Sequence, residues 1–258
     1  MTSKSCVKRS VLYQAIRKPY LHLRNFHLNL GRVKSDKIDS IYVINLDKRP
    51  DRMTQLRYNF RKCSIPIERV QAVYGAEFSD QYQVMYAPKA KTVMSKGQIA
   101  CIQSHQRSWQ QMLDGGKQVA WIVEDDALLK YLYARNVDPW LREIEEIDPD
   151  WEIIYSYKST VDHFYDVASI NGVLPHVGHS KRHYDKPHTK HSVICGPGTC
   201  MAGYLISRKG AKKLLELTKE IHYPLDVQIP LAHQEIRMYA FKPMLSYYFE
   251  DGISDSAK

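Results

Sequence analysis

The sequence predicts one α/β domain built on a twisted, largely parallel sheet that is flanked by helices. Segments with strand-like and helix-like patterns alternate along the chain. The segment VAWIV at 119–123 is apolar on both alternating faces, which is typical of a central strand covered on both sides. A length of 258 residues with 44% hydrophobic content suffices for one sizeable core. We therefore expect a single domain.

The first half of the chain shows the alternation clearly. Residues 38–46 (IDSIYVINL) predict a strand, and Pro50 suits the first position of the helix that follows. Residues 67–73 predict a second strand. Ser95 then suits the N-cap of a longer helix, which Gly115 ends. VAWIV follows as the next strand.

The second half continues the pattern with one interruption. It predicts a helix around 137–147, a strand at 151–157, a strand followed by a helix in 203–217, and a strand around 236–241. Residues 158–198 contain six histidines and show no apolar period. We therefore expect 158–198 to be a long, His-rich loop inserted beside the site.

Positive charge is concentrated at the N-terminus. Residues 1–37 hold nine Lys or Arg side chains against Asp36 alone, so +8 of the chain's net +9 lies there. We interpret 1–37 as a basic extension and 38–258 as the main domain. The extension could be solvated or pack on the domain, or it could contact an anionic membrane surface. Nucleic acid is the least expected partner.

Targeting signals and cysteines indicate the compartment. The chain has no run of 18 or more apolar residues, and charges interrupt its N-terminus where a secretion signal needs an apolar stretch. Its five cysteines are an odd number, spread too thinly for a disulfide scaffold. We expect a soluble, cytoplasmic protein, either free or bound peripherally at the cytoplasmic face of a membrane.

Three consecutive acids follow the central strand. In open α/β sheets, ligands bind outside the carboxyl ends of strands, which is where Glu124, Asp125 and Asp126 lie. Glu124 and Asp126 can face one way while Asp125 turns back. Two convergent carboxylates suit a hard cation such as Mg²⁺ or Mn²⁺. The alternative is a solvated acidic turn that caps the next helix.

Five further side chains or amides are candidates for substrate binding. Lys96 and Gly97 open a helix, where backbone N–H groups and the helix dipole favour a phosphate. Arg49 and Arg52, after the first strand, offer a second pair of phosphate contacts, or form a solvated turn. His105 is either a substrate contact or a hydrogen-bonded core histidine.

A zinc site is conceivable in HTKHSVICGPGTC. It would combine His188, His191, Cys195 and Cys200. The gap between the cysteines is wider than the usual finger spacing, and Cys200 opens an apolar segment. A loop and a buried thiol are the expected reading.

Six motifs in order resemble glycosyltransferase family 25, which includes lipooligosaccharide and collagen galactosyltransferases. They are IYVINLDKRPDR, SKGQIACIQSHQRSW followed by WIVEDD, DWEIIY, AGYLISRKGAKKLL, YPLDVQIP and EDGISDS. Together the motifs span about residues 38–256. Collagen-type members carry a second acid after the aspartate of the proline-flanked motif, where this chain has Val227.

The resemblance implies a GT-A-like, Rossmann-like fold and a transferase that uses a nucleotide-sugar donor, usually a UDP-sugar, with inversion at the anomeric carbon. Arg49 and Arg52 match the family's opening arginines, and Glu124, Asp125 and Asp126 match its acidic triplet. Within that triplet we expect Glu124 and Asp126 to bind the metal and Asp125 to contact the donor. The transferred sugar would be a hexose, galactose or glucose, and the acceptor a hydroxyl of a glycan, glycolipid or protein. Lipopolysaccharide biosynthesis is one such setting.

Asp226 matches the aspartate of the proline-flanked motif. An inverting transfer needs a base for the acceptor hydroxyl, and Asp226 is the candidate. It could equally be a metal ligand or a helix cap. Two other classes stay open: a metal-dependent phosphoryl-transfer enzyme, and a non-catalytic nucleotide- or nucleic-acid-binding module that uses the basic arm.

Overall fold

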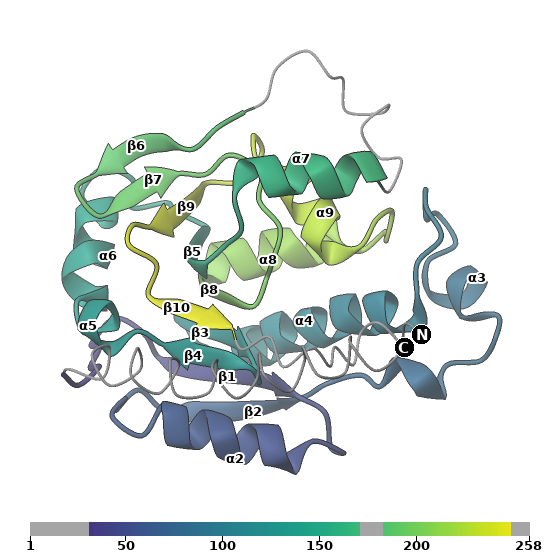
Figure 1. Ribbon diagram of the computed structural model, residues 1–258, viewed down its shortest axis with the longest axis horizontal. Helices are drawn as coiled ribbons and strands as arrows, with labels where there is room; N and C mark the ends of the chain where they lie inside the picture. The colour runs from purple at the N-terminus through teal and green to yellow at the C-terminus, as the bar shows by residue number, and fades with distance from the viewer. Residues whose placement is uncertain (1–30, 171–182, 249–258) are drawn as a thin grey trace, which may run out of the picture.

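The computed structural model describes residues 31–170 and 183–248, which build a central sheet between two layers of helices (Figure 1). The large sheet has the order β2-β1-β3-β8-β5-β9-β7-β6, and β10 pairs separately with β4. The strands are β1 (Ser40–Asn45), β2 (Ile67–Gln71), β3 (Val119–Glu124), β4 (Ala127–Leu129), β5 (Ile153–Tyr157), β6 (Lys186–Thr189), β7 (Ser192–Ile194), β8 (Gly203–Ser207), β9 (Met238–Phe241) and β10 (Ser246–Tyr248).

Helices cover both faces of the sheet. They are α2 (Pro50–Asn59), the 3₁₀ turn η1 (Gly75–Glu77), α3 (Tyr82–Tyr86), α4 (Lys96–Asp114), α5 (Tyr131–Ala134), α6 (Val137–Glu145), α7 (Val161–Ile170), α8 (Arg208–Leu217) and α9 (Leu225–Leu231). One apolar core forms between the sheet and α4, α8 and α9, and a second between the sheet and α2, α5 and α6. Among the residues that the structure describes, no helix is both long enough and apolar enough to cross a membrane.

The alternation of side chains along β3 explains why it is central. Ala120 and Ile122 enter the first core, while Trp121 and Val123 enter the second. All four are completely buried. The expectation that VAWIV is covered on both sides is therefore confirmed.

The predicted α/β class is confirmed, and the sheet within it is mixed. β1 runs parallel to both β2 and β3, and β5 parallel to β9. β8 lies between β3 and β5 and is antiparallel to both, and the β6–β7 hairpin adds antiparallel pairs at one edge. The carboxyl ends of β1, β3 and β5 consequently meet at the edge where β8 begins.

The predicted caps of α4 are present. Ser95 accepts a hydrogen bond from the Gln98 amide (3.1 Å), and the Gln98 side chain accepts one from the Ser95 amide (2.8 Å), forming a capping box. Gly115 ends the helix. The tail motif YPLDVQIP (223–230) holds all of α9 except its last residue, Leu231.

The prediction that 158–198 is a loop is wrong for three segments, α7, β6 and β7. α7 places Val161, Phe164, Tyr165 and Ala168 on one face, at the i, i+3, i+4 and i+7 spacing of an amphipathic helix, in an apolar cluster that also includes α9. β7 pairs with β9 and thereby extends the sheet. The interspersed histidines and charges obscured this period; residues 171–182 lie outside the described residues.

The basic extension can be followed only from residue 31. Val33 is buried and forms a bridge with Cys63, and Lys37 pairs with Glu145 of α6. Ser35 bonds the Asp138 carboxylate. Residues 33–37 therefore pack on the domain, whereas residues 1–30, which hold most of the predicted arm, lie outside the described residues.

Candidate functional site

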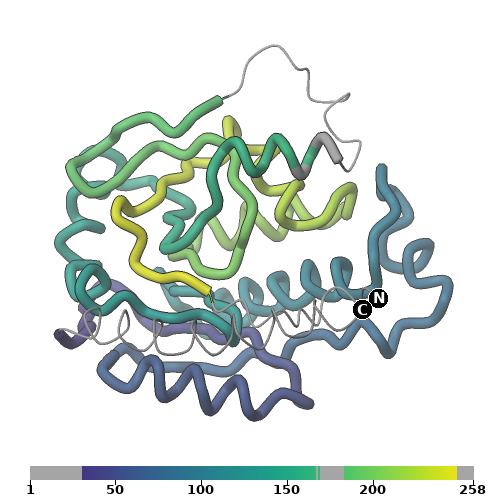
Figure 2. Tube along the Cα trace, in the orientation of Figure 1, coloured from purple at the N-terminus to yellow at the C-terminus, as the bar shows by residue number. Residues whose placement is uncertain are grey.

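The acidic triplet forms a turn that is held on both sides. Glu124 is the last residue of β3 and pairs with Ile44 of β1. Asp125 and Asp126 lead into β4, which pairs antiparallel with β10 near the end of the described chain (Figure 2). The turn lies at the carboxyl end of a central strand, as predicted.

Asp125 faces the loop that follows β1. Its carboxylate accepts hydrogen bonds from Asn45 Nδ2 (2.7 Å) and Arg52 Nη1 (3.1 Å). Burial raises the pKa of Asp125, and Asn45 and Arg52 partly offset this rise. Arg49 bonds Asp51 (2.9 Å). Asp125 and Arg52 thus fix the β1–α2 loop to the acidic turn, and their predicted contact with the donor stays a prediction.

Asp126 has an unsatisfied carboxylate. Its Oδ1 is buried and has no hydrogen-bond partner within residues 31–170 and 183–248. Burial and the nearby charges of Glu124 and Asp125 raise its pKa to about 8. A buried oxygen without a donor, repelled by two carboxylates, fits an oxygen ligand for a divalent cation.

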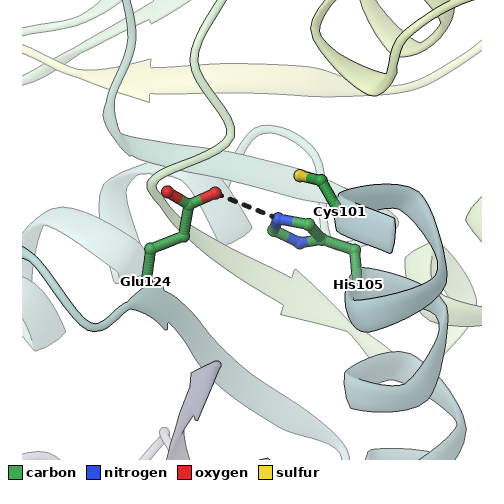
Figure 3. Close-up of side chains that lie close together, drawn as sticks. All are labelled: Cys101, His105 and Glu124. Atoms are coloured by element: carbon green, nitrogen blue, oxygen red, sulfur yellow. Dashed lines mark hydrogen bonds and ion pairs between the residues drawn. The ribbon is translucent and has the colours of Figure 1, made fainter. Parts of the chain in front are cut away.

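Glu124 points toward α4. Figure 3 shows its carboxylate opposite His105 and Cys101, and the Oε1 to Nε2 distance is 3.4 Å. One ligand atom from each of the three residues lies within 4.8 Å of the others. The Glu124 side chain is 35% exposed, so it can also reach a ligand from solvent.

His105 is completely buried. Its Nδ1 lies 2.9 Å from the hydroxyl of Tyr204 on β8, and that hydroxyl also accepts a bond from Trp109 Nε1 (2.7 Å). Of the two interpretations given for His105, the structure therefore shows the hydrogen-bonded core histidine. His105 also contacts Glu124, a predicted metal ligand. Its predicted role in donor binding stays a prediction.

Asp226 approaches the same cluster from the first turn of α9. Its carboxylate accepts bonds from the backbone amides of Cys200 and Met201, the latter at 3.0 Å. The surrounding protein hinders its hydration, and this, with the Glu124 charge, raises the pKa of Asp226 although the residue is exposed. Since its bonds reach the segment before β8 rather than α9, the helix-cap reading is not supported.

Two thiols lie near these carboxylates, which raise the pKa of both thiols. The pKa of the Cys101 thiol is raised by burial and by Glu124 and Asp226, and that of Cys200 by burial and by Asp226 and Glu124. Burial and the neighbouring carboxylates therefore keep both thiols protonated and uncharged. Metal binding by Glu124 and Asp126 stays a prediction.

Comparison with known sequences decides the family. A family model described as glycosyltransferase family 25 (LPS biosynthesis protein) matches residues 38–229. The chain belongs to this family. It is 30% identical over 217 residues to a glycosyltransferase 25 family member of Aedes aegypti, which covers 78% of this chain and 32% of that protein. It is 22% identical over 265 residues to procollagen galactosyltransferase 1-B of Xenopus laevis, which covers 90% and 39%.

This family 25 chain therefore spans between about a third and two fifths of the length of these relatives. Among solved structures, mouse xyloside xylosyltransferase 1 is similar, with 15% sequence identity and a TM-score of 0.41. The match covers 81% of this chain and 74% of that one.

At the start of α4, the predicted phosphate site, Lys96 contacts the loop after η1. Lys96 Nζ donates to Phe78 O (2.8 Å) and pairs with Asp80 (3.1 Å). Gly97 is buried, and η1 packs so tightly on this end that a Cβ on Gly75 would lie 2.5 Å from Lys96 O. Phosphate binding at Lys96 and Gly97 stays a prediction.

The four candidate zinc ligands have separate partners in the family 25 domain. The His188 ring packs on Tyr239, and His191 bonds Glu143 (2.6 Å) and stacks on Trp140. Cys195 is buried, and Cys200 lies beside Asp226.

Sequence reasoning missed three residues that shape the site: Asn45, Cys101 and Tyr204. The first two carried a signal, because Asn45 is a polar residue ending an apolar strand and Cys101 lies four positions before His105 on one helix face. Tyr204 is one of 18 tyrosines in the chain, and nothing local distinguishes it.

Proposed function

We propose that the chain is a hexosyltransferase that moves a hexose, galactose or glucose, from a UDP-sugar to a hydroxyl of a glycan, glycolipid or protein. The transfer inverts the anomeric carbon and depends on Mn²⁺ or Mg²⁺. The observation that carries the proposal is the orphaned Asp126 Oδ1 beside Glu124 at the carboxyl end of β3, in a domain of glycosyltransferase family 25.

Glu124 and Asp126 would hold the cation, which when bound neutralises charge on the diphosphate leaving group. Asp125, anchored by Asn45 and Arg52, fixes the backbone of the turn that presents them. This preorganisation matters because a loosely held carboxylate must be ordered before it can bind.

Asp226 would take the proton from the attacking acceptor hydroxyl. Two backbone amides orient its carboxylate, and its raised pKa makes it a stronger base than an ordinary aspartate. Its exposure leaves the carboxylate accessible to an acceptor.

The proposal extends to location and partners. We propose a cytoplasmic protein that contacts anionic lipid through its basic N-terminus, which suits a lipid-linked acceptor. The deletion that tests this removes residues 1–30 only, because Val33 and Lys37 belong to the packed domain. We expect the deletion to abolish binding to anionic vesicles. Unchanged binding would refute the proposal that the basic N-terminus contacts anionic lipid.

The decisive experiment follows nucleotide release from a panel of UDP-, GDP- and CMP-sugars with Mn²⁺. Wild-type protein is compared with Asp126→Asn and with Asp166→Asn, which removes an exposed acid on α7. We expect release from one UDP-sugar, lost with chelator and in Asp126→Asn but kept in Asp166→Asn.

Other outcomes separate the alternative classes. Phosphate release from UDP itself would indicate phosphoryl transfer. Metal-dependent UDP binding without turnover of any donor and acceptor would indicate a binding module. Absence of both binding and release would make the acidic turn structural.

A further inference from the structure

Four side chains from three elements form a continuous hydrogen-bonded line into the site. Trp109 Nε1 lies 2.7 Å from the Tyr204 hydroxyl, which lies 2.9 Å from His105 Nδ1. On the other side of the ring, His105 Nε2 lies 3.4 Å from Glu124 Oε1. Trp109, Tyr204 and His105 are completely buried, so water does not compete for these bonds.

The direction of every bond in this line follows from the first one. An indole nitrogen can only donate, so Trp109 donates to the Tyr204 oxygen. The Tyr204 hydrogen then needs an acceptor, and within the described chain the other atom in reach is His105 Nδ1. Nδ1 therefore accepts, and the ring proton lies on Nε2, facing Glu124.

The opposite tautomer would leave a buried hydroxyl unsatisfied. With hydrogen on Nδ1, both Trp109 and His105 would donate to Tyr204, and the Tyr204 hydrogen would have no acceptor among the described residues. Burying a donor without a partner is costly. The same reasoning argues against a soft metal bound by Cys101, His105 and Glu124, since that ion needs the Nε2 lone pair.

We propose that Trp109 and Tyr204 fix His105 as the Nε2–H tautomer, and that this N–H positions the Glu124 carboxylate for the divalent cation. His105 is thus a positioning residue that acts through Glu124. The tautomer itself is independent of the proposed function, whereas its consequence for cation binding rests on it.

The tautomer can be measured in metal-free protein. Long-range ¹H–¹⁵N correlation of protein labelled at histidine distinguishes a protonated from an unprotonated ring nitrogen, and the His105→Gln variant identifies the His105 signals among the eleven histidines. We expect hydrogen on Nε2 in the wild type. Hydrogen on Nδ1, or loss of the Nε2 proton when Zn²⁺ alone is added, would overturn the inference.

A matched pair of variants tests the consequence. Gln places an amide N–H where Nε2 lies and can still donate to Glu124, whereas Asn places its amide near Nδ1 and reaches only Tyr204. We expect Mn²⁺ affinity, measured by calorimetry without donor, to stay close to wild type in His105→Gln. In His105→Asn we expect it to fall by about tenfold or more.

Tyr204→Phe tests the remote half of the line. Without the Tyr204 hydroxyl, His105 should no longer be fixed as the Nε2–H tautomer, so the Nε2 proton signal should weaken. Mn²⁺ affinity should fall less than in His105→Asn. Tyr131→Phe is the control: it removes an equally buried hydroxyl whose partners are the backbone of Asn59 and Lys62, and it should change neither readout.

These measurements distinguish failure of the positioning role from failure of the proposed function. Equal loss of affinity in the Gln and Asn variants would refute positioning by the N–H. Failure of wild-type protein to bind Mn²⁺ would refute the metal-dependent function and the positioning role together, while the NMR result would still decide the tautomer.

Discussion

Asp126 should make the metal-free protein less stable as pH rises through the acidic and neutral range, and Asp126→Asn should remove this contribution. The folded protein raises the pKa of Asp126 from the ordinary 3.8 to about 8. Between these values the folded state holds a proton that the unfolded state has released, so rising pH favours unfolding.

The magnitude follows from this single proton. A full difference of one proton costs about 1.4 kcal/mol per pH unit. Solvent reaches the partly exposed Asp126 side chain, so we expect about 1 kcal/mol per unit, or about 2 kcal/mol between about pH 5 and about pH 7. Asparagine cannot ionise and removes this contribution.

Urea unfolding in EDTA, followed by tryptophan fluorescence, measures the effect. Asp166→Asn is the control and should keep the wild-type slope. Added Mn²⁺ should stabilise the wild type more as pH rises, because binding requires the ionised carboxylate. An identical pH slope in wild type and Asp126→Asn would refute the reasoning.

Three other substitutions probe the surroundings of the site. Arg52→Met leaves Asp125, whose side chain is 10% exposed, without its cation and should lower the free energy of unfolding by about 2 kcal/mol in urea; no change would make the pair incidental. Cys200→Gly should raise the free energy of unfolding by up to about 1 kcal/mol, because Cys200 has a φ of 81°; a lower free energy of unfolding would mean that the thiol's packing outweighs the strain. Lys158→Met removes the buried partner of Asp185 (3.0 Å) and should speed hydrogen exchange in the β6–β7 hairpin; unchanged exchange would show that this ion pair does not hold the hairpin.

Local patterns made part of this structure predictable. The apolar faces of β3, the capping box of α4 and the acidic turn depend on neighbours within a few residues, so the sequence displays them directly. The position of Glu124 and Asp126 outside a strand end follows from the same local pattern. The resemblance to family 25 added Asp226, which no spacing would have selected.

Long-range pairing was not predictable in the same way. The position of β8 between β3 and β5 places antiparallel pairs at the centre of the sheet, and no local pattern reports strand order. The contact between His105 and Tyr204 joins residues 99 positions apart. It arises only because α4 packs on the face of the sheet where Tyr204 points, so the positioning line could not be seen before the fold.

The pairing of β4 with β10 makes the acidic turn dependent on the end of the described chain. Ser246–Tyr248 supply the partner strand for Ala127–Leu129, which directly follow Asp126. During synthesis, residues 124–126 are made more than a hundred residues before Ser246, so β4 is at first an unpaired edge strand. Nascent chains that stop short of residue 246 should therefore lack the strand that pairs with β4 directly after the acidic turn.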